Sequence, residues 1–235
     1  MKDRVSRVAW QAQGGDTEST SRLRRELAHV LWLGGSACAG KTSAARALAA
    51  AHGLALYSCD DRFEEHRRRA VPALHPHFCR LMDLPVERLW RPPAAARARE
   101  LLRYYQDELT MVIEDLRALP GPVLAEGVGL LPAAVAAVIS SPHQACWLLA
   151  TPEFRRRHYP QRGAWLAELL GRCPDPERAF AAGMDRDDHL ARRLAAQAAA
   201  LALPCIEIDG AATVAATAAA LAGHFHLAAQ PAVLS

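Results

Sequence analysis

The sequence predicts an α/β fold, with a five-stranded parallel sheet that carries helices on both faces. Five short apolar segments alternate along the chain with segments that have the apolar spacing of helices. The apolar segments are hydrophobic at most positions, as strands covered on both faces are. The first of them leads directly into a glycine-rich loop and an alanine-rich helical segment. We expect the strands at residues 30–33, 54–58, 122–127, 144–150 and 204–208.

The composition is that of an ordinary globular protein. The chain has 235 residues, of which 51% are hydrophobic and 23% charged, and its net charge is +3. This small charge gives no footprint for nucleic acid. No run reaches the roughly 18 apolar residues of a membrane-spanning helix, and the N-terminus lacks the apolar centre of a signal peptide. We therefore expect a cytoplasmic protein that binds neither nucleic acid nor membranes.

The chain divides into three regions. Residues 1–28 are expected to form a polar arm and a short helix, which Thr20 or Ser21 would cap. Residues 29–225 contain all five expected strands and form the main domain. Residues 226–235 form a tail.

A phosphate-binding loop follows the first strand. The pattern G-x-x-x-x-G-K-[ST] is matched by Gly35, Gly40, Lys41 and Thr42. Its glycines let successive backbone N–H groups turn toward a phosphate, and the next helix adds its positive dipole end. Lys41 would reach the β- and γ-phosphates, and the Thr42 hydroxyl would bind Mg²⁺. The expected nucleotide-binding residues are Gly35, Ser36, Ala37, Cys38, Ala39, Gly40, Lys41, Thr42 and Ser43.

Two carboxylates follow the second strand. Asp60 and Asp61 come just after residues 54–58, and ligands bind at the carboxyl ends of parallel strands. We interpret Asp60 as the group that accepts a proton from a substrate hydroxyl, with Asp61 supporting it at the substrate. The alternative is that both residues only cap the next helix, because Asp is a favoured N-cap residue.

A further carboxylate, Glu126, ends the third expected strand. At this place it would either hold Mg²⁺ through water or hydrogen-bond the phosphate acceptor. The alternative is a buried carboxylate that pairs with an arginine for structural reasons.

The acceptor side of the site is expected in residues 62–92, which are rich in Arg, His and Pro. We interpret them as mobile helices. Residues 93–119 then have the periodic apolar stripe of a core-facing helix, and we assign Tyr104 and Tyr105 within it to packing.

Arginines cluster after the fourth strand, from Arg155 to Arg157 and again at Arg162. An arginine that contacts the transferring phosphoryl group can accelerate transfer by about 10³–10⁵. We therefore expect residues 153–172 to form a mobile lid that closes over the nucleotide, with Arg155 and Arg162 as catalytic residues. Arg186, on the following long helix, would add a phosphate contact or form a surface ion pair.

These features together resemble a known family. Asp60 follows Lys41 by nineteen residues, an arginine-rich segment precedes the long helix, and I-E-I-D-G closes the last strand. The chain thus resembles the small P-loop kinases of the nucleoside-monophosphate-kinase type, above all the chloramphenicol phosphotransferase, shikimate kinase and gluconate kinase branches. The resemblance implies that Asp60 is the general base and that residues after Asp209 lie near the adenine of ATP.

We therefore expect a kinase that uses ATP and Mg²⁺ to phosphorylate a hydroxyl of a small metabolite or an antibiotic-like molecule. Two alternatives stay open. The strand ending in Glu126 and Gly127 is also similar to the zeta-toxin pattern, which would indicate a kinase of a sugar nucleotide. The other alternative is a regulatory nucleotide-binding protein with slow ATPase activity. A guanine-reading N-K-x-D sequence is absent, which favours adenine.

Overall fold

The computed structural model of the chain, which describes residues 18–228, confirms the predicted sheet. Five strands pair in the order β2-β3-β1-β4-β5, and every pair is parallel. The strands are β1 (Val30–Gly35), β2 (Ala55–Ser58), β3 (Val123–Glu126), β4 (Ala145–Ala150) and β5 (Cys205–Ile208).

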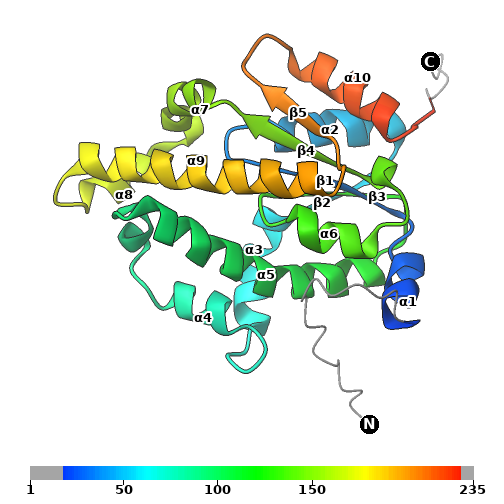
Figure 1. Cartoon of the computed structure of the whole chain (residues 1–235), viewed down its shortest axis with the longest axis horizontal. Helices are drawn as coiled ribbons and strands as arrows, with labels where there is room; N and C mark the ends of the chain where they lie inside the picture. Colours follow the sequence, from blue (N-terminus) through cyan, green and yellow to red (C-terminus); the bar gives the residue numbers. More distant parts are fainter. Residues whose placement is uncertain (1–17, 229–235) are drawn as a thin grey trace.

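Helices cover both faces of this sheet (Figure 1). On one face α2 (Lys41–His52) packs beside α10 (Val214–His224), and on the other face lie α5 (Ala94–Ala118), α6 (Pro132–Val138) and α9 (Pro176–Ala200). Further helices are α1 (Glu18–Glu26), α3 (Cys59–Arg69), α4 (Pro76–Met82), α7 (Pro152–His158) and α8 (Ala164–Gly171). The short 3₁₀ helices are η1 (Val86–Trp90), η2 (Pro142–Gln144) and η3 (Tyr159–Arg162). Within residues 18–228, no helix has the length and apolar character needed to cross a membrane.

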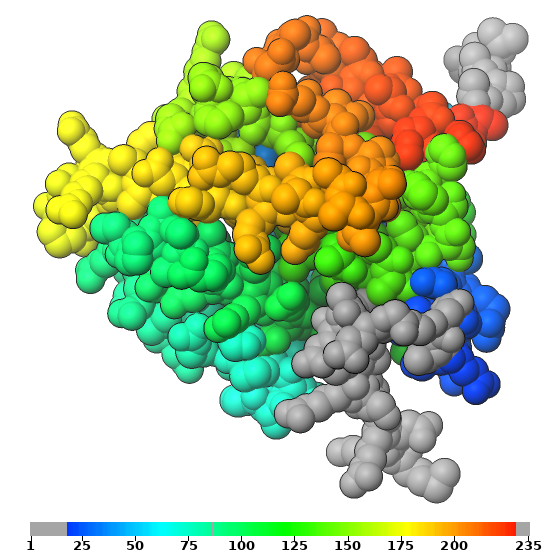
Figure 2. Space-filling view, viewed as in Figure 1, coloured from blue at the N-terminus to red at the C-terminus, as the bar shows by residue number. Residues whose placement is uncertain are grey.

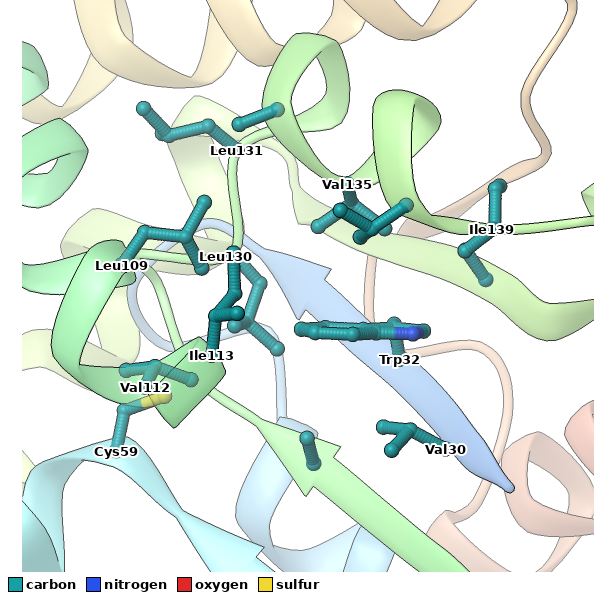
Figure 3. Close-up of a cluster of buried hydrophobic side chains, with 14 of the residues drawn as sticks. Val30, Trp32, Cys59, Leu109, Val112, Ile113, Leu130, Leu131, Val135 and Ile139 are labelled. Carbon is teal, nitrogen blue, oxygen red and sulfur yellow. The ribbon is translucent and has the colours of Figure 1, made fainter. Parts of the chain in front are cut away.

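The central strand supplies side chains to both halves of the core. Val30 and Trp32 are buried among α5, α6 and α9 (Figure 3), whereas Leu33 is buried against α2 and α10. Successive side chains of a strand point to opposite faces, so β1 must be apolar throughout. This explains why the first apolar run in the sequence shows no alternation.

The register of the strands brings three chain segments to one edge of the sheet. Glu126 at the end of β3 is level with Leu33 of β1 and with Ser58 of β2. The glycine-rich loop begins after β1, and Asp60 comes two residues after Ser58. The loop, Asp60 and Glu126 therefore lie side by side at the carboxyl edge, as expected for a parallel sheet.

Helix ends follow the sequence signals with two exceptions. Gly53 ends α2 in the left-handed conformation, and the Thr151 side chain caps α7. The expected cap of the first helix is wrong, because α1 already begins at Glu18 and includes Thr20 and Ser21. The capping alternative for Asp60 and Asp61 is also wrong, since the side chain of Ser58 accepts the hydrogen bond from the Asp61 amide. The expected arm and tail lie mostly outside the described residues.

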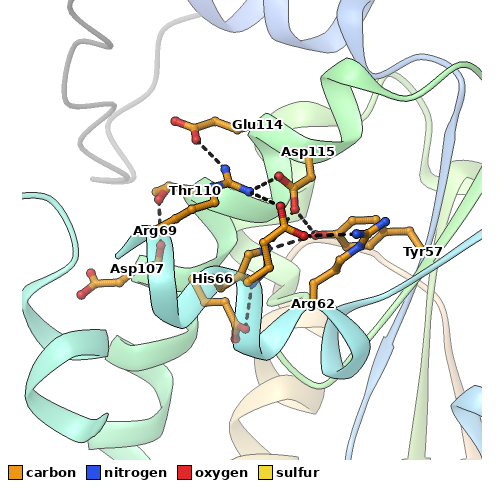
Figure 4. A network of polar contacts seen from close by, with 10 residues as sticks. Tyr57, Arg62, His66, Arg69, Asp107, Thr110, Glu114 and Asp115 are labelled. Atoms are coloured by element: carbon orange, nitrogen blue, oxygen red, sulfur yellow. Dashed lines mark hydrogen bonds and ion pairs between the residues drawn. The ribbon is translucent and has the colours of Figure 1, made fainter. Parts of the chain in front are cut away.

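A buried polar network fixes α3 against α5 (Figure 4). His66 of α3 is fully buried, with Nδ1 3.2 Å from Glu108 and Nε2 3.1 Å from Asp115. Asp115 also accepts hydrogen bonds from Arg69 and from the hydroxyl of Tyr57 at 2.8 Å. Burial alone would lower the pKa of His66, but its hydrogen bonds to the two carboxylates outweigh burial and raise this pKa. We infer that His66 is a cation that two carboxylates of α5 hold in place.

The network predicts a pH-dependent stability. A histidine whose pKa is raised on folding stabilises the protein below its unfolded value of 6.5 and loses this contribution as the pH rises through the folded value. Glu108, whose pKa is raised by burial, acts in the same direction, whereas the lowered pKa of Asp115 matters only in acid. From about pH 6 to about pH 8.5, the wild type should lose more unfolding free energy than His66→Gln, by about 1.4 kcal/mol per unit of pKa shift.

Urea unfolding at the two pH values measures this difference. His77→Gln on α4 is the control, because its side chain lies outside the network, and it should behave like the wild type. Equal pH dependence in the wild type and His66→Gln would show that His66 is not held as a cation.

Candidate functional site

The glycine-rich loop between β1 and α2 has a backbone that only certain residues adopt readily. Gly35 has φ 135°, and a Cβ atom there would lie 2.0 Å from the carbonyl oxygen of Leu148. Gly40, the residue before α2, is left-handed with φ 72°, and so is Cys38 with φ 59°. Alternation of right- and left-handed residues turns backbone N–H groups inward to form an anion-binding concavity. The first N–H groups of α2, from Lys41 onward, lack partners within the helix and add to it.

The side chain of Ser36 anchors this loop to the sheet. Its Oγ accepts a hydrogen bond from the amide of Ala150 at 2.8 Å, and its own amide donates to Leu148 at 2.9 Å. Ser36 is buried and fixes the loop on β4. Ala39 is buried as well, whereas Ala37 and Cys38 are half-buried, and Gly40 and Ser43 are exposed.

Lys41, Thr42 and Glu126 meet beneath the loop. The Thr42 hydroxyl donates to Oε1 of Glu126 at 3.1 Å, and Nζ of Lys41 donates to the Ser36 carbonyl at 2.7 Å. Burial lowers the pKa of Lys41, while the charges of Glu126 and Asp60 oppose this shift. Burial likewise raises the pKa of Glu126, and Lys41 and Thr42 oppose it. Each of these groups is therefore buried beside a partner of complementary charge or hydrogen-bonding capacity.

Glu126 does not form the arginine pair that the structural alternative required. Its described partners are Thr42 and the charge of Lys41, and the Ser58 hydroxyl also hydrogen-bonds it. A threonine hydroxyl and a carboxylate at hydrogen-bond distance are both hard oxygen ligands, the kind that Mg²⁺ prefers. The pair therefore fits a magnesium ion at this place. Within residues 18–228, no group of three His, Cys, Asp or Glu side chains is arranged to hold a metal without help from other ligands.

Asp60 lies at the centre of the charged groups of the site. It is exposed in the first turn of α3, and its charge affects Lys41, Glu126 and Arg162. It also affects Tyr104, Tyr105 and Glu108 on α5. Asp61 is exposed one position further along, about 100° around the helix. The two predicted carboxylates thus occupy different faces of α3.

Arg162 is the member of the arginine cluster that approaches the loop. Its guanidinium carbon lies 5.2 Å from the ring centre of Tyr159 and 5.8 Å from that of Trp165. Its charge affects both Lys41 and Cys38. Two aromatic faces therefore hold an exposed arginine beside the glycine-rich loop.

Arg155, the other predicted catalytic arginine, has a structural environment. Its side chain is 1% exposed, forms an ion pair with Asp188 of α9 and donates to the Ala150 carbonyl at 2.7 Å. Arg155 thus ties α7 to α9 and to the end of β4. Its charge still affects Cys38 of the loop, but its hydrogen-bonding groups are turned to the protein.

Arg186 is also buried rather than a surface ion pair. It pairs with Asp187 at 2.8 Å, donates to the Leu89 carbonyl at 3.1 Å and lies 5.0 Å from the ring centre of Trp90. Asp187 has one buried oxygen, Oδ2, without a hydrogen-bond partner. Neither Asp187 nor Trp90 was singled out from the sequence. Of the three, the sequence singled out only Arg186, as a phosphate contact or a surface ion pair.

Asp209 lies at the far end of the same sheet edge. It is exposed after β5, and its side chain accepts a hydrogen bond from the Ala211 amide at 2.8 Å. The next residue, Gly210, leaves room for the ring of Phe154, which a Cβ atom would meet at 2.9 Å. The turn after β5 therefore packs directly against α7.

Comparisons with known proteins add nothing to this geometry, since neither the protein-family models nor the curated proteins searched include a match to the chain.

The two arginines should respond differently to substitution. Arg155→Met removes one of the two arginine partners of Asp188, the other being Arg156, and leaves the Ala150 carbonyl unsatisfied. It should therefore lower the unfolding free energy by about 2 kcal/mol. Arg162→Met removes an exposed side chain and should change the unfolding free energy by no more than about 0.5 kcal/mol. Denaturant unfolding of both variants measures the difference. Similar losses in both would contradict the structural role of Arg155.

Proposed function

We propose that this protein is a phosphotransferase that moves the γ-phosphoryl group of ATP to a hydroxyl of a small acceptor molecule. The observation that supports it most is the meeting of the loop, Lys41, Glu126 and Asp60 at one edge of the sheet. Phosphoryl transfer requires cationic groups for the phosphates and a carboxylate for the acceptor hydroxyl. Both kinds of group occur here within electrostatic reach of one another.

The donor half of the site consists of the loop and the start of α2. Backbone N–H groups of residues 37–43 would bind the phosphates, and Lys41 would turn from the Ser36 carbonyl to the β- and γ-phosphates. Thr42 and Glu126 would hold Mg²⁺, which neutralises charge on the phosphate oxygens when it is bound. Arg162 is the arginine best placed to bind the transferring group, because it combines exposure with proximity to Lys41.

The acceptor half is centred on Asp60. In the transfer, the acceptor oxygen forms a bond to the γ-phosphorus while the bond from this phosphorus to the bridging oxygen of ADP breaks. The acceptor proton goes to the Asp60 carboxylate, which also orients the hydroxyl. Asp60 is exposed and has no hydrogen-bonded role in capping α3, so its carboxylate is available for this task.

Nucleotide binding should depend on Lys41. Lys41→Met should weaken binding of ATP with Mg²⁺ by about tenfold to a hundredfold, because a charge-assisted hydrogen bond to phosphate is lost. Calorimetric titration measures the dissociation constant. Arg46→Met is the matched control, since Arg46 is an exposed cation on the same helix and should bind ATP normally. Normal binding by Lys41→Met would contradict the proposed donor site.

Turnover should depend on Asp60. An acceptor is first found by thermal-shift screening of hydroxylated metabolites and antibiotics, with Mg²⁺ and a non-hydrolysable ATP analogue present. With that acceptor, Asp60→Asn should lower kcat by about 10²–10⁴ and leave ATP binding nearly unchanged. Asp61→Asn removes the same charge from the neighbouring face of α3. Because Asp61 would only support the substrate, this variant should lower kcat far less than Asp60→Asn. ADP release that needs no acceptor and is unaffected by Asp60→Asn would instead indicate a regulatory ATPase.

A further inference from the structure

An open apolar groove lies beside α3, on the acceptor side of the site. Its volume is about 330 Å³, within the range of about 300–1,000 Å³ usual for small-molecule sites. All its lining residues fall within the segment 62–92 for which acceptor binding was expected. They are Phe63, Arg67, Leu81, Met82, Leu84, Pro85 and Leu89.

The groove is the open side of a small hydrophobic cluster. Phe78 and Leu81 of α4 are buried in this cluster with Leu101, Tyr104 and Met111 of α5, and the rings of Phe78 and Tyr104 stack at 4.8 Å. The groove-lining residues Phe63, Met82, Leu84 and Leu89 pack on this cluster but are only partly buried. Apolar surface thus stays uncovered in a part of the chain that also contains many charged residues.

Helix α3 connects the groove to Asp60. Asp60, Phe63 and Arg67 stand at positions i, i+3 and i+7 and therefore share one face of the helix. At 1.5 Å per residue, Phe63 and Arg67 follow Asp60 by about 5 and about 10 Å along the axis. Two further interactions, one electrostatic and one a hydrogen bond, link the groove to the site. Tyr104 of the underlying cluster feels the charge of Asp60, and the Leu89 carbonyl accepts from Arg186.

The opposite face of α3 keeps this geometry in place, because His66 and Arg69 bind Asp115 of α5. Figure 2 shows the cyan and teal segments of this region at the surface below α9. Asp60 and the two groove residues of α3, Phe63 and Arg67, therefore keep a fixed separation on one helix, and α4 and the segment after it supply the rest of the groove.

We propose that the acceptor is an amphipathic alcohol, whose hydroxylated end reaches Asp60 while an apolar group of roughly acyl-chain or aromatic size lies in the groove. This inference builds on the proposed phosphotransferase function and adds a substrate class to it. Groove contacts supply binding energy remote from the reacting hydroxyl and thereby orient it. A small, fully polar acceptor would leave the groove empty.

The test uses alkyl β-D-glucosides of increasing chain length, below their micelle-forming concentrations, with glucose as the polar reference. Binding to the full-length protein is measured by calorimetry in the presence of Mg²⁺ and a non-hydrolysable ATP analogue. From hexyl to octyl glucoside, the affinity should rise about fourfold per methylene group, and glucose should bind most weakly.

Two groove variants test the location. Met82→Gln introduces a polar group at a half-buried position, and Leu84→Phe fills the groove with a larger side chain that has no polar atom. Each should remove the dependence on chain length. Leu201→Gln changes an exposed leucine at the end of α9, outside the groove. In this control variant, the affinity should still rise with chain length. The two groove variants differ in chemistry, so the test still works if one of them fails to fold. The midpoint of denaturant unfolding shows whether each variant is folded.

Three results would overturn the proposal: equal binding of glucose and octyl glucoside, a chain-length dependence that survives both groove variants, or a change of molecular mass in solution on substitution. The last result would identify the groove as an interface between copies of the chain. Binding of the ATP analogue in the same samples separates the two proposals. If the analogue binds but chain length has no effect, the groove assignment alone fails; if the analogue does not bind, the donor site fails.

Discussion

The constraint on which the site depends is the register of the three strands on one side of the sheet. Because Leu33, Glu126 and Ser58 are level, β3 and β2 end at the same height, and β1 continues beyond them to Gly35, where the loop begins. The hydrogen bond from Thr42 to Glu126 then joins the first turn of α2 to the end of β3. A shift of one residue in either pairing would turn Glu126 to the other face of the sheet and break this contact. The burial of Val30, Trp32 and Leu33 on the two faces opposes such a shift.

Around this edge, charged side chains are oriented by apolar or aromatic neighbours rather than by charge alone. Arg162 lies on Tyr159 and Trp165, and Arg186 lies on Trp90. A long side chain loses conformational entropy when a ligand fixes it in one position. If an aromatic ring already holds the side chain in that position, less entropy is lost on binding. The ion pair between Arg155 and Asp188 fixes two helices instead of a single side chain, because it ties α7 to α9.

The sequence was sufficient for the sheet and for the position of the glycine-rich loop, since both depend on local patterns. Buried strands must be apolar throughout, and a loop with positive φ at Gly35 and Gly40 needs glycine. It was not sufficient for the arginines. Arg155 and Arg162 are seven residues apart and both close to prolines, yet one is buried against Asp188 and the other exposed, because their environments come from α9 and α8. Tyr104 packs as expected. The charge of Asp60 also raises the pKa of Tyr104, and this effect depends on how α3 packs against α5.

The cluster formed by α4 and α5 has a consequence for how such a protein can change. Its buried members, Phe78, Leu81, Leu101, Tyr104 and Met111, are separate from the two cores that hold the sheet, and they meet the larger core through Tyr105. Substitutions in this cluster alter the groove while the strands and the phosphate-binding loop keep their packing. The structure therefore divides into a sheet with its glycine-rich loop, which is costly to vary, and a surface groove that is open to variation. Under the proposed function, new acceptors could be selected, in evolution or in the laboratory, without rebuilding the nucleotide side.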